Sequence, residues 1–311
     1  MKKSLLAMTI AGILGAPVAA QAETKIFGKV HMSTGMVEET KSGATTTDNW
    51  QNRSHASRLG VKGSHDLGGG MKANYHLEFE VNPDSDNEAD GGTGDGHDGT
   101  AGIKRRNQWV GLAAGWGEVR IGRHDTPLKV AQGKFDQFND TDADIKGKYK
   151  ISQGELRGDN AIAYIGSFGS LTIAAAAIAS EGDGTTAGDS VADTISVAAM
   201  YKAGPLFVSL AQDAYDDTSG QESSSLTRAV ATYNMGSMTA GVLFETGGNG
   251  DAVDEKDVMG LSFAMKMGGN KLKLQYVSGE DGAATPVETT QTSVGYDVKL
   301  SKKVTGYVMY T

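Results

Sequence analysis

The chain of 311 residues contains 43 glycines, five prolines and no cysteine. Without cysteine it can form neither a disulfide framework nor a thiol-based metal or redox site. Its formal net charge of -9 argues against a nucleic-acid partner, because a phosphate backbone demands a basic protein face.

The N-terminus has the pattern of a secretory signal. Two lysines precede an apolar run over residues 5–20, and an Ala-x-Ala triplet ends at Ala22. A threonine, two glycines and a proline interrupt this run, whereas a membrane-spanning helix needs about 18 or more apolar residues in succession. We therefore expect a signal peptide over residues 1–22, cleaved after Ala22, and a mature domain over residues 23–311.

Most of the chain that follows alternates apolar and polar residues with a period of two. Within residues 71–81, Leu77 and Phe79 share one face while Glu78 and Glu80 share the other. This alternation predicts a β-strand, because successive side chains of a strand point to opposite faces. The same period recurs over residues 58–62, 118–121, 271–276 and 293–300.

Short glycine-rich turns alternate with longer polar loops, for example residues 67–70 against residues 82–102. About fifteen strand-like segments of roughly ten residues each fit a transmembrane barrel. Many strands carry charges on their polar face, and burying each unpaired ion would cost several kcal/mol, whereas a water-filled lumen leaves it hydrated. The sequence thus predicts an all-β fold, a transmembrane antiparallel up-and-down β-barrel.

Two rival classes remain open at this level. A secreted, soluble β-rich adhesin or binding protein would show the same alternation, but it would bury alternate residues in a packed core. An outer-membrane barrel enzyme would need a nucleophile and a base that converge at the rim, and no Gly-x-Ser-x-Gly elbow occurs. The six histidines show no metal-ligand spacing, so the sequence predicts no metal, no cofactor and no catalytic site.

The most specific motif covers residues 57–73 and runs on into Tyr75 and Phe79. It resembles the second and third strands of the Gram-negative general porins. Other segments resemble the first, fourth and fifth strands of that family, and the strand that follows its third loop. In chain order these segments are residues 26–29, 106–112, 117–123 and 157–164. The second half of the chain resembles the family only in the regular spacing of its strand-like segments and turns.

The resemblance implies a sixteen-stranded barrel that lets small hydrophilic solutes and ions diffuse passively across the outer membrane. It also implies a third loop folded into the lumen, a homotrimer, and contact with outer-membrane lipid and lipopolysaccharide. Family members end with a strand that closes on a C-terminal aromatic residue, whereas this sequence stops at Thr311. We therefore expect about fifteen strands here, with the closing strand missing.

The resemblance also implies which side chains line the pore. The expected basic ladder consists of Lys29, Arg58, Arg106 and Arg157, with Arg120 and Arg123 as further candidates. The expected constriction acids, on a loop running from about residue 125 to residue 155, are Asp136, Asp140 and Asp142. Opposed rows of fixed charge across a narrow aqueous gap would orient water and bias ion passage. Alternation supports the inward direction of Lys29, Arg58 and Arg157, but it leaves that of Arg106 and the sign of ion preference open.

Overall fold

The computed structural model describes residues 24–41, 44–83, 103–146, 151–179, 192–216, 224–248, 256–282 and 286–311. The expected signal peptide, residues 1–22, and nearly all of the predicted polar loop over residues 82–102 lie outside the described residues. The described helix α2 (Pro127–Ala131) has five residues. In this part of the chain no helix has the length and apolar character needed to cross a bilayer.

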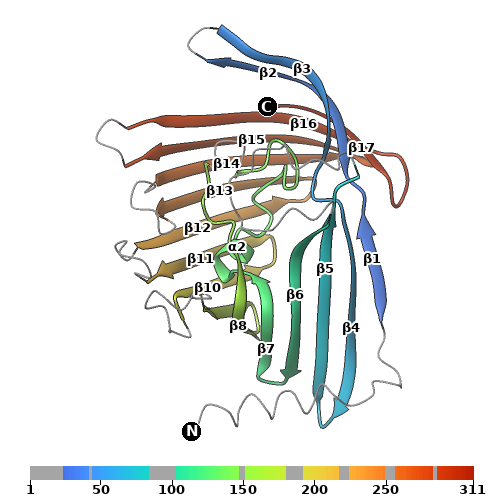
Figure 1. Cartoon of the computed structure of the whole chain (residues 1–311), viewed down its shortest axis with the longest axis vertical. Helices are drawn as coiled ribbons and strands as arrows, with labels where there is room; N and C mark the ends of the chain where they lie inside the picture. The colour runs from blue at the N-terminus through green and yellow to red at the C-terminus, as the bar shows by residue number, and fades with distance from the viewer. Residues whose placement is uncertain are drawn as a thin grey trace.

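Strands make up most of the described chain. Fifteen of them form one antiparallel sheet in which β1 pairs with β4 and every later strand pairs with its neighbours in sequence, while β2 and β3 form a separate pair (Figure 1). The strands are β1 (Lys25–Lys29), β2 (Met32–Lys41), β3 (Ala44–Ser54), β4 (Arg58–Gly68), β5 (Met71–Val81), β6 (Ile103–Ala114), β7 (Gly117–Asp125), β8 (Arg157–Phe168), β9 (Leu171–Ile178), β10 (Thr194–Ala203), β11 (Leu206–Tyr215), β12 (Ser224–Met235), β13 (Met238–Gly247), β14 (Lys256–Met267), β15 (Asn270–Asp281), β16 (Glu288–Lys299) and β17 (Thr305–Tyr310).

The β2–β3 pair continues the hairpin formed by β1 and β4. The β1–β4 ladder ends where Lys29 pairs with Arg58, and the β2–β3 ladder starts where Met32 pairs with Ser54. One hairpin is thus interrupted by a short irregular break, so β1 with β2 forms one pass of the chain and β3 with β4 the next. The predicted all-β, antiparallel up-and-down architecture is confirmed.

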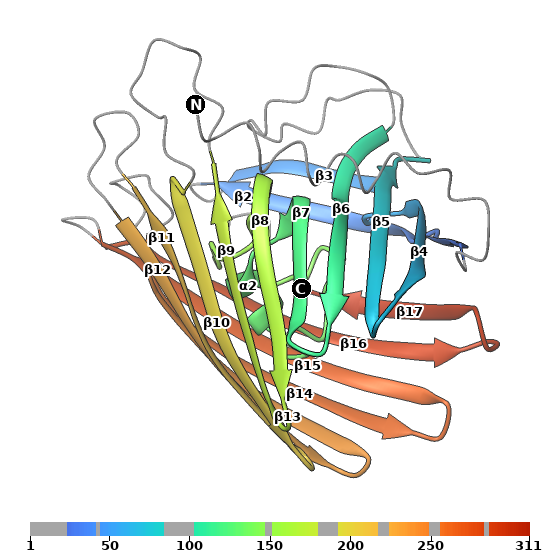
Figure 2. The ribbon, with the colours of Figure 1, turned by 90° about the horizontal axis from the view of Figure 1, so that it is seen from below.

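The large sheet curves around a central space. Figure 2 shows β4 to β8 on one side and β10 to β17 on the other, with α2 on the concave side. The two edges of the sheet are β1 and β17, and no ladder joins them among the described residues. A side-chain contact brings the two ends of the sheet together, because His31 Nε2 lies 3.0 Å from Tyr307 Oη.

The exposed large apolar side chains lie mainly on the outside of this sheet, and the inner face is mainly polar except where the segment between β7 and β8 packs on it, the reverse of a soluble sandwich. Leu59, Phe244 and Leu261 are about half exposed on the outer face. Ser262 and Gln275 are buried on the inner face. This distribution is typical of a barrel whose outer band faces lipid, and it does not fit the soluble alternative.

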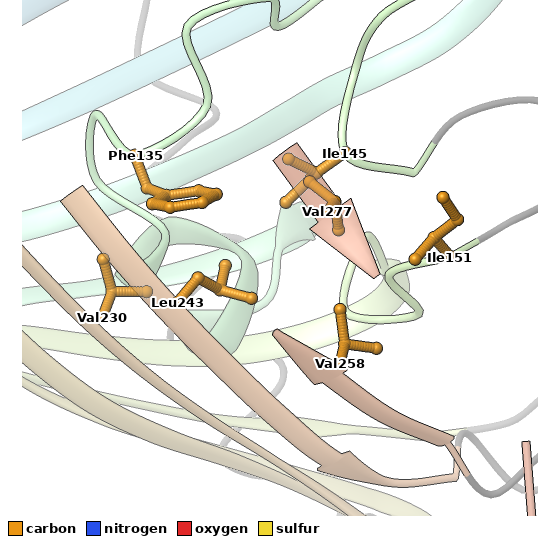
Figure 3. Close-up of a cluster of buried hydrophobic side chains, with 7 residues drawn as sticks. All are labelled: Phe135, Ile145, Ile151, Val230, Leu243, Val258 and Val277. Carbon is orange, nitrogen blue, oxygen red and sulfur yellow. The ribbon is translucent and has the colours of Figure 1, made fainter. Parts of the chain in front are cut away.

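The buried apolar residues lie inside the barrel, where the segment between β7 and β8 packs on one wall. Phe135, Ile145 and Ile151 of this segment are at most 2% exposed. Figure 3 shows them against Val230, Leu243, Val258 and Val277 of β12 to β15. Burial of each large apolar side chain contributes about 1.5–3 kcal/mol, so this contact is enough to hold the segment on the wall.

Glycine in the wall leaves room for an aromatic ring of the loop. A Cβ atom at Gly260 would lie 2.5 Å from Cζ of Phe135, and one at Gly295 would lie 2.6 Å from Cε1 of Phe138. Any larger residue at these two positions would force the ring away from the strand, because contacts this short do not occur between unbonded carbon atoms. Glycine therefore has a packing role in the strands of this wall in addition to its role in the turns.

We expect Phe135→Ala to lower the free energy of unfolding by about 3–5 kcal/mol, since it leaves a cavity between the loop and the wall. Denaturant unfolding of the refolded barrel in detergent measures this change. Phe168→Ala is the matched control, because Phe168 ends β8 and is 56% exposed. Equal losses in the two variants would contradict the packing described above.

Candidate functional site

The segment between β7 and β8, residues 126–156, is called the constriction loop below. Thr126 N–H donates to the carbonyl of Leu156 at 3.2 Å and so joins the two ends of the loop. Two serines of the wall are hydrogen-bonded to the two ends of α2. Leu128 N–H donates to Ser196 Oγ at 3.2 Å, and Ser209 Oγ donates to the carbonyl of Ala131 at 2.6 Å. The loop predicted from the sequence thus lies in the lumen, fixed to β10 and β11.

A fully buried charge network fixes the returning arm of the loop. The guanidinium of Arg228 on β12 lies 2.6 Å from a carboxylate oxygen of Glu245 on β13, and both side chains are 0% exposed. Arg228 also donates to Ser152 Oγ at 2.7 Å, and Gln153 N–H donates to Glu245 at 2.7 Å. The carboxylate of Glu155 lies 3.5 Å from the guanidinium of Arg228. Buried charges persist only when they are paired and hydrogen-bonded, and here the loop supplies part of the pairing.

The tip of the loop reaches the opposite wall through two aspartates. Asp140 accepts a hydrogen bond from Lys29 Nζ at 3.1 Å and is also paired with Arg58. Asp142 accepts one from Arg53 at 2.6 Å. The predicted acid Asp140 therefore meets two predicted bases, whereas the predicted acid Asp142 meets Arg53, which the sequence did not single out.

The environment of Asp140 favours its charged form. Burial alone would raise the pKa of this carboxyl, but Arg58 and Lys29 outweigh it and hold the pKa below its ordinary value. The backbone of Asp140 is left-handed, with φ of 58°, a conformation that aspartate and asparagine tolerate better than most residues. Asn is therefore a replacement that changes the charge and keeps the backbone.

Two further arginines of the predicted ladder stand on the same wall with acidic partners. Arg106 lies 2.6 Å from Glu78 and 2.8 Å from Glu80. Arg157 lies 2.9 Å from Asp125, where the loop begins. Each base of the ladder is thus held in place by a carboxylate, which fixes its position in the lumen.

The two additional arginine candidates occupy different places. Arg123 is paired with Asp159, which also lies 3.8 Å from Arg105. The guanidinium of Arg120 lies 2.6 Å from Glu118 and 3.9 Å from the ring centroid of Trp109, toward the short turns. Arg123 pairs in register with Gln108, the partner of outward-facing Leu77, so the structure does not place either candidate beside the acids of the loop tip.

Known proteins match both this sequence and this fold. The model of the Gram-negative porin family matches residues 6–311. The chain belongs to the Gram-negative porin family. Outer membrane porin protein 32 of Delftia acidovorans is 29% identical over 322 residues, which cover 99% of this chain and 88% of that protein. Among solved structures, the anion-selective porin from Comamonas acidovorans has a TM-score of 0.74 at 25% identity, over 92% of this chain and 87% of that one. OmpF of Salmonella typhi, in complex with daunomycin, has a TM-score of 0.74 at 13% identity, over 92% and 89%.

The porin is therefore an outer-membrane protein whose barrel forms a water-filled channel for passive diffusion. Within its lumen, a cleft of about 350 Å³ lies beside the constriction loop. Lys129 and Lys134 of the loop line this cleft together with Lys271 of β15 and Asp125. Basic side chains therefore stand on the loop as well as on the facing wall.

The third predicted acid has a different position in the porin. The carboxylate of Asp136 accepts hydrogen bonds from the backbone N–H of Phe138 at 2.7 Å and of Ile145 at 3.2 Å. Burial, and after it the neighbouring Asp144, raise the pKa of Asp136 to about 7. Asp136 thus braces the loop from within, whereas Asp140 and Asp142 pair with the wall.

The sequence interpretation missed the partners of the predicted residues. Alternation placed Glu78 and Glu80 on the polar face of their strand, but nothing local shows that both converge on one arginine. Arg228 and Glu245 lie on the inner face of their strands, and only the packed loop distinguishes them from exposed lumen charges. Arg53 lies outside the motifs that resemble the family.

Asp136 makes the stability of the porin dependent on pH. Its pKa is higher in the folded chain than the ordinary value near 4, so its contribution is fully present below about pH 4 and is lost as the pH rises through about 7. We expect Asp136→Asn, which keeps an acceptor oxygen, to remove this loss. Measured at pH 4, 6 and 8, the urea midpoint of Asp136→Asn should exceed that of the parent protein by an amount that grows with pH.

Asp66→Asn is the control for this series, because Asp66 is exposed near the end of β4 and its carboxylate accepts a similar hydrogen bond from Gly68 N–H at 2.7 Å. A gain for Asp136→Asn that is the same at all three pH values would contradict the assignment.

Proposed function

We propose that the paired charges between the constriction loop and the facing wall form the filter of this channel, and that the filter prefers anions. The observation that carries the proposal is the convergence of Lys29 and Arg58 on Asp140 at the loop tip. Arg106 and Arg157 continue the basic series along the wall. A solute that passes the tip therefore moves along a row of guanidinium groups that are fixed in position.

The preference for anions rests on the second basic surface. Lys134 and Lys271 border the cleft beside the loop, so an anion there has two ammonium groups beside it. Asp125 and Asp136 also line the cleft, and Lys129, its third lysine, is paired with Asp125 and with Glu155. At the loop tip two cations, Lys29 and Arg58, share the one carboxylate of Asp140, so this cluster keeps a net positive charge. The Comamonas acidovorans porin is described as anion-selective, and we extend that preference to this chain.

We infer that the chain acts as a channel and not as an enzyme. The relatives reported above are porins, and the carboxylates at the constriction are engaged with guanidinium or ammonium groups. A carboxylate in such a pair is stabilised in its charged form and is a weak general base. The lumen therefore supports selection of solutes better than chemistry on them.

We also propose how the barrel closes and assembles. One further strand between β17 and β1 would satisfy the two open edges, as a bilayer requires of every backbone group. Ile26 and Val308, on these two strands, are 77% and 70% exposed and would then face lipid or a neighbouring subunit. We propose a signal peptide over residues 1–22 on the pattern of the N-terminal residues, and a homotrimer and contact with lipopolysaccharide on the resemblance to the family.

Planar-bilayer recordings under a potassium chloride gradient test the filter. The parent channel should show a reversal potential of the sign that chloride preference gives. Arg58→Ala should lower the chloride-to-potassium permeability ratio by roughly two- to tenfold, because it removes a fixed cation, and Asp140→Asn should raise it. Lys303→Ala, in the exposed turn after β16, is the control. An unchanged ratio in both lumen variants would refute the filter, and cation preference in the parent channel would refute anion selection.

A further inference from the structure

A row of aromatic rings lies along the inner wall next to the filter. The rings of Phe27 on β1 and His76 on β5 are 5.2 Å apart between centroids. His76 and Trp109 on β6 are stacked, with centroids 5.7 Å apart and planes 10° from parallel. Three strands therefore contribute to one continuous aromatic surface, called the aromatic row below.

The aromatic row faces the lumen and not the lipid. His76 shares its strand face with Glu78, a partner of Arg106 in the filter. Leu77, between them, is 40% exposed on the opposite, outer face. The register places Trp109 beside His76, so Trp109 lies on the same inner face.

Glycine lets the first ring lie flat on the wall. Phe27 pairs in register with Gly60 of β4, and a Cβ atom at Gly60 would lie 2.5 Å from Cζ of Phe27. A larger residue would lift this ring into the lumen, whereas glycine keeps the surface low and the passage open.

A cation stands at each end of the aromatic row. Lys62 Nζ lies 5.2 Å from the centroid of the Phe27 ring, and the guanidinium carbon of Arg120 lies 3.9 Å from that of Trp109. The side chains of His76 and Arg120 are 19% and 21% exposed, so water reaches both. Arg120 is paired with Glu118, so Lys62 supplies the positive charge that a ligand on this surface would meet.

The position of the aromatic row puts it on the path of a solute. Along β4, Arg58 pairs with Glu80 at the filter, and Lys62 pairs with His76 four residues nearer to the short turn. The helix of the constriction loop contacts β9 to β12, so its packing is on the other wall. The aromatic row therefore follows the filter in the lumen and is separate from the packing of the loop.

Aromatic side chains in a water-filled lumen gain stability when a flat apolar surface displaces water from them. Packing among the rings accounts for part of the arrangement, and Glu118 accounts for the position of Arg120, but neither accounts for Lys62 over the ring at the other end of the row. A planar ring with one carboxylate fits this surface, because its ring can lie along the row and its charge can pair with Lys62. We propose that the aromatic row is a binding site for small aromatic carboxylates, which rests on the proposed preference for anions and names a solute class for it.

Single-channel current in potassium chloride, with benzoate added in steps, tests the proposal. Benzoate should reduce the current with a saturable dependence, whereas acetate at equal concentration should change it only in proportion to its concentration. Trp109→Leu should raise the half-saturating benzoate concentration by about two- to tenfold, the range that aromatic stacking produces. Trp116→Leu is the matched control, since Trp116 lies in the turn after β6, is 46% exposed and stacks on Tyr164. No saturation with benzoate, or equal shifts in the two variants, would overturn the proposal.

Fluorescence gives a second readout that does not need the leucine variant to fold. The chain has three tryptophans, so Trp50→Phe combined with Trp116→Phe leaves Trp109 alone. Quenching by 4-nitrobenzoate should saturate in the same concentration range as the block of current, and linear quenching would overturn the binding site. Chloride selectivity measured without benzoate tests the filter by itself. An incorrect proposal for the aromatic row can therefore be told apart from an incorrect proposal for the filter.

Discussion

A loop that lies inside a water-filled barrel can define a passage only if one wall holds it fast, and the other features of the lumen depend on that attachment. Two kinds of contact provide it here. Phe135, Ile145 and Ile151 remove apolar surface from water against β12 to β15. The buried Arg228–Glu245 pair of the wall is hydrogen-bonded to Ser152 and Gln153 of the returning arm, and these bonds are lost if the arm moves away. The apolar contact supplies most of the free energy, and the charged pair fixes the register.

Attachment to one wall decides what faces the opposite wall. With the body of the loop held on β10 to β15, its tip extends to β1, β3 and β4, where Asp140 and Asp142 meet Lys29, Arg58 and Arg53. The passage is then bounded by fixed guanidinium groups on one side and loop lysines on the other. Because each wall arginine has a carboxylate partner, the lumen can hold many charges of both signs.

The period of two in the sequence was enough to predict the strands and the inward direction of most polar residues, because that period follows directly from strand geometry. The place of the constriction loop came instead from the resemblance of its flanking motifs to the family. The sequence could not separate Asp136 from Asp140, since both are loop aspartates and only the folded loop turns one toward its own backbone N–H groups. Nor could it find the aromatic row, because Phe27, His76 and Trp109 come from strands distant in sequence and meet only through register.

The distance between the loop and the far end of the sheet tests the central claim most directly. The chain has no cysteine, so spin labels can be attached specifically at Lys134→Cys in the loop and Leu300→Cys in the turn after β16. Double electron–electron resonance in detergent and in bilayers should give one narrow distance distribution that is the same in both. A broad distribution, or several populations, would show that the loop is not held on the wall, and the filter derived from its position would then be wrong.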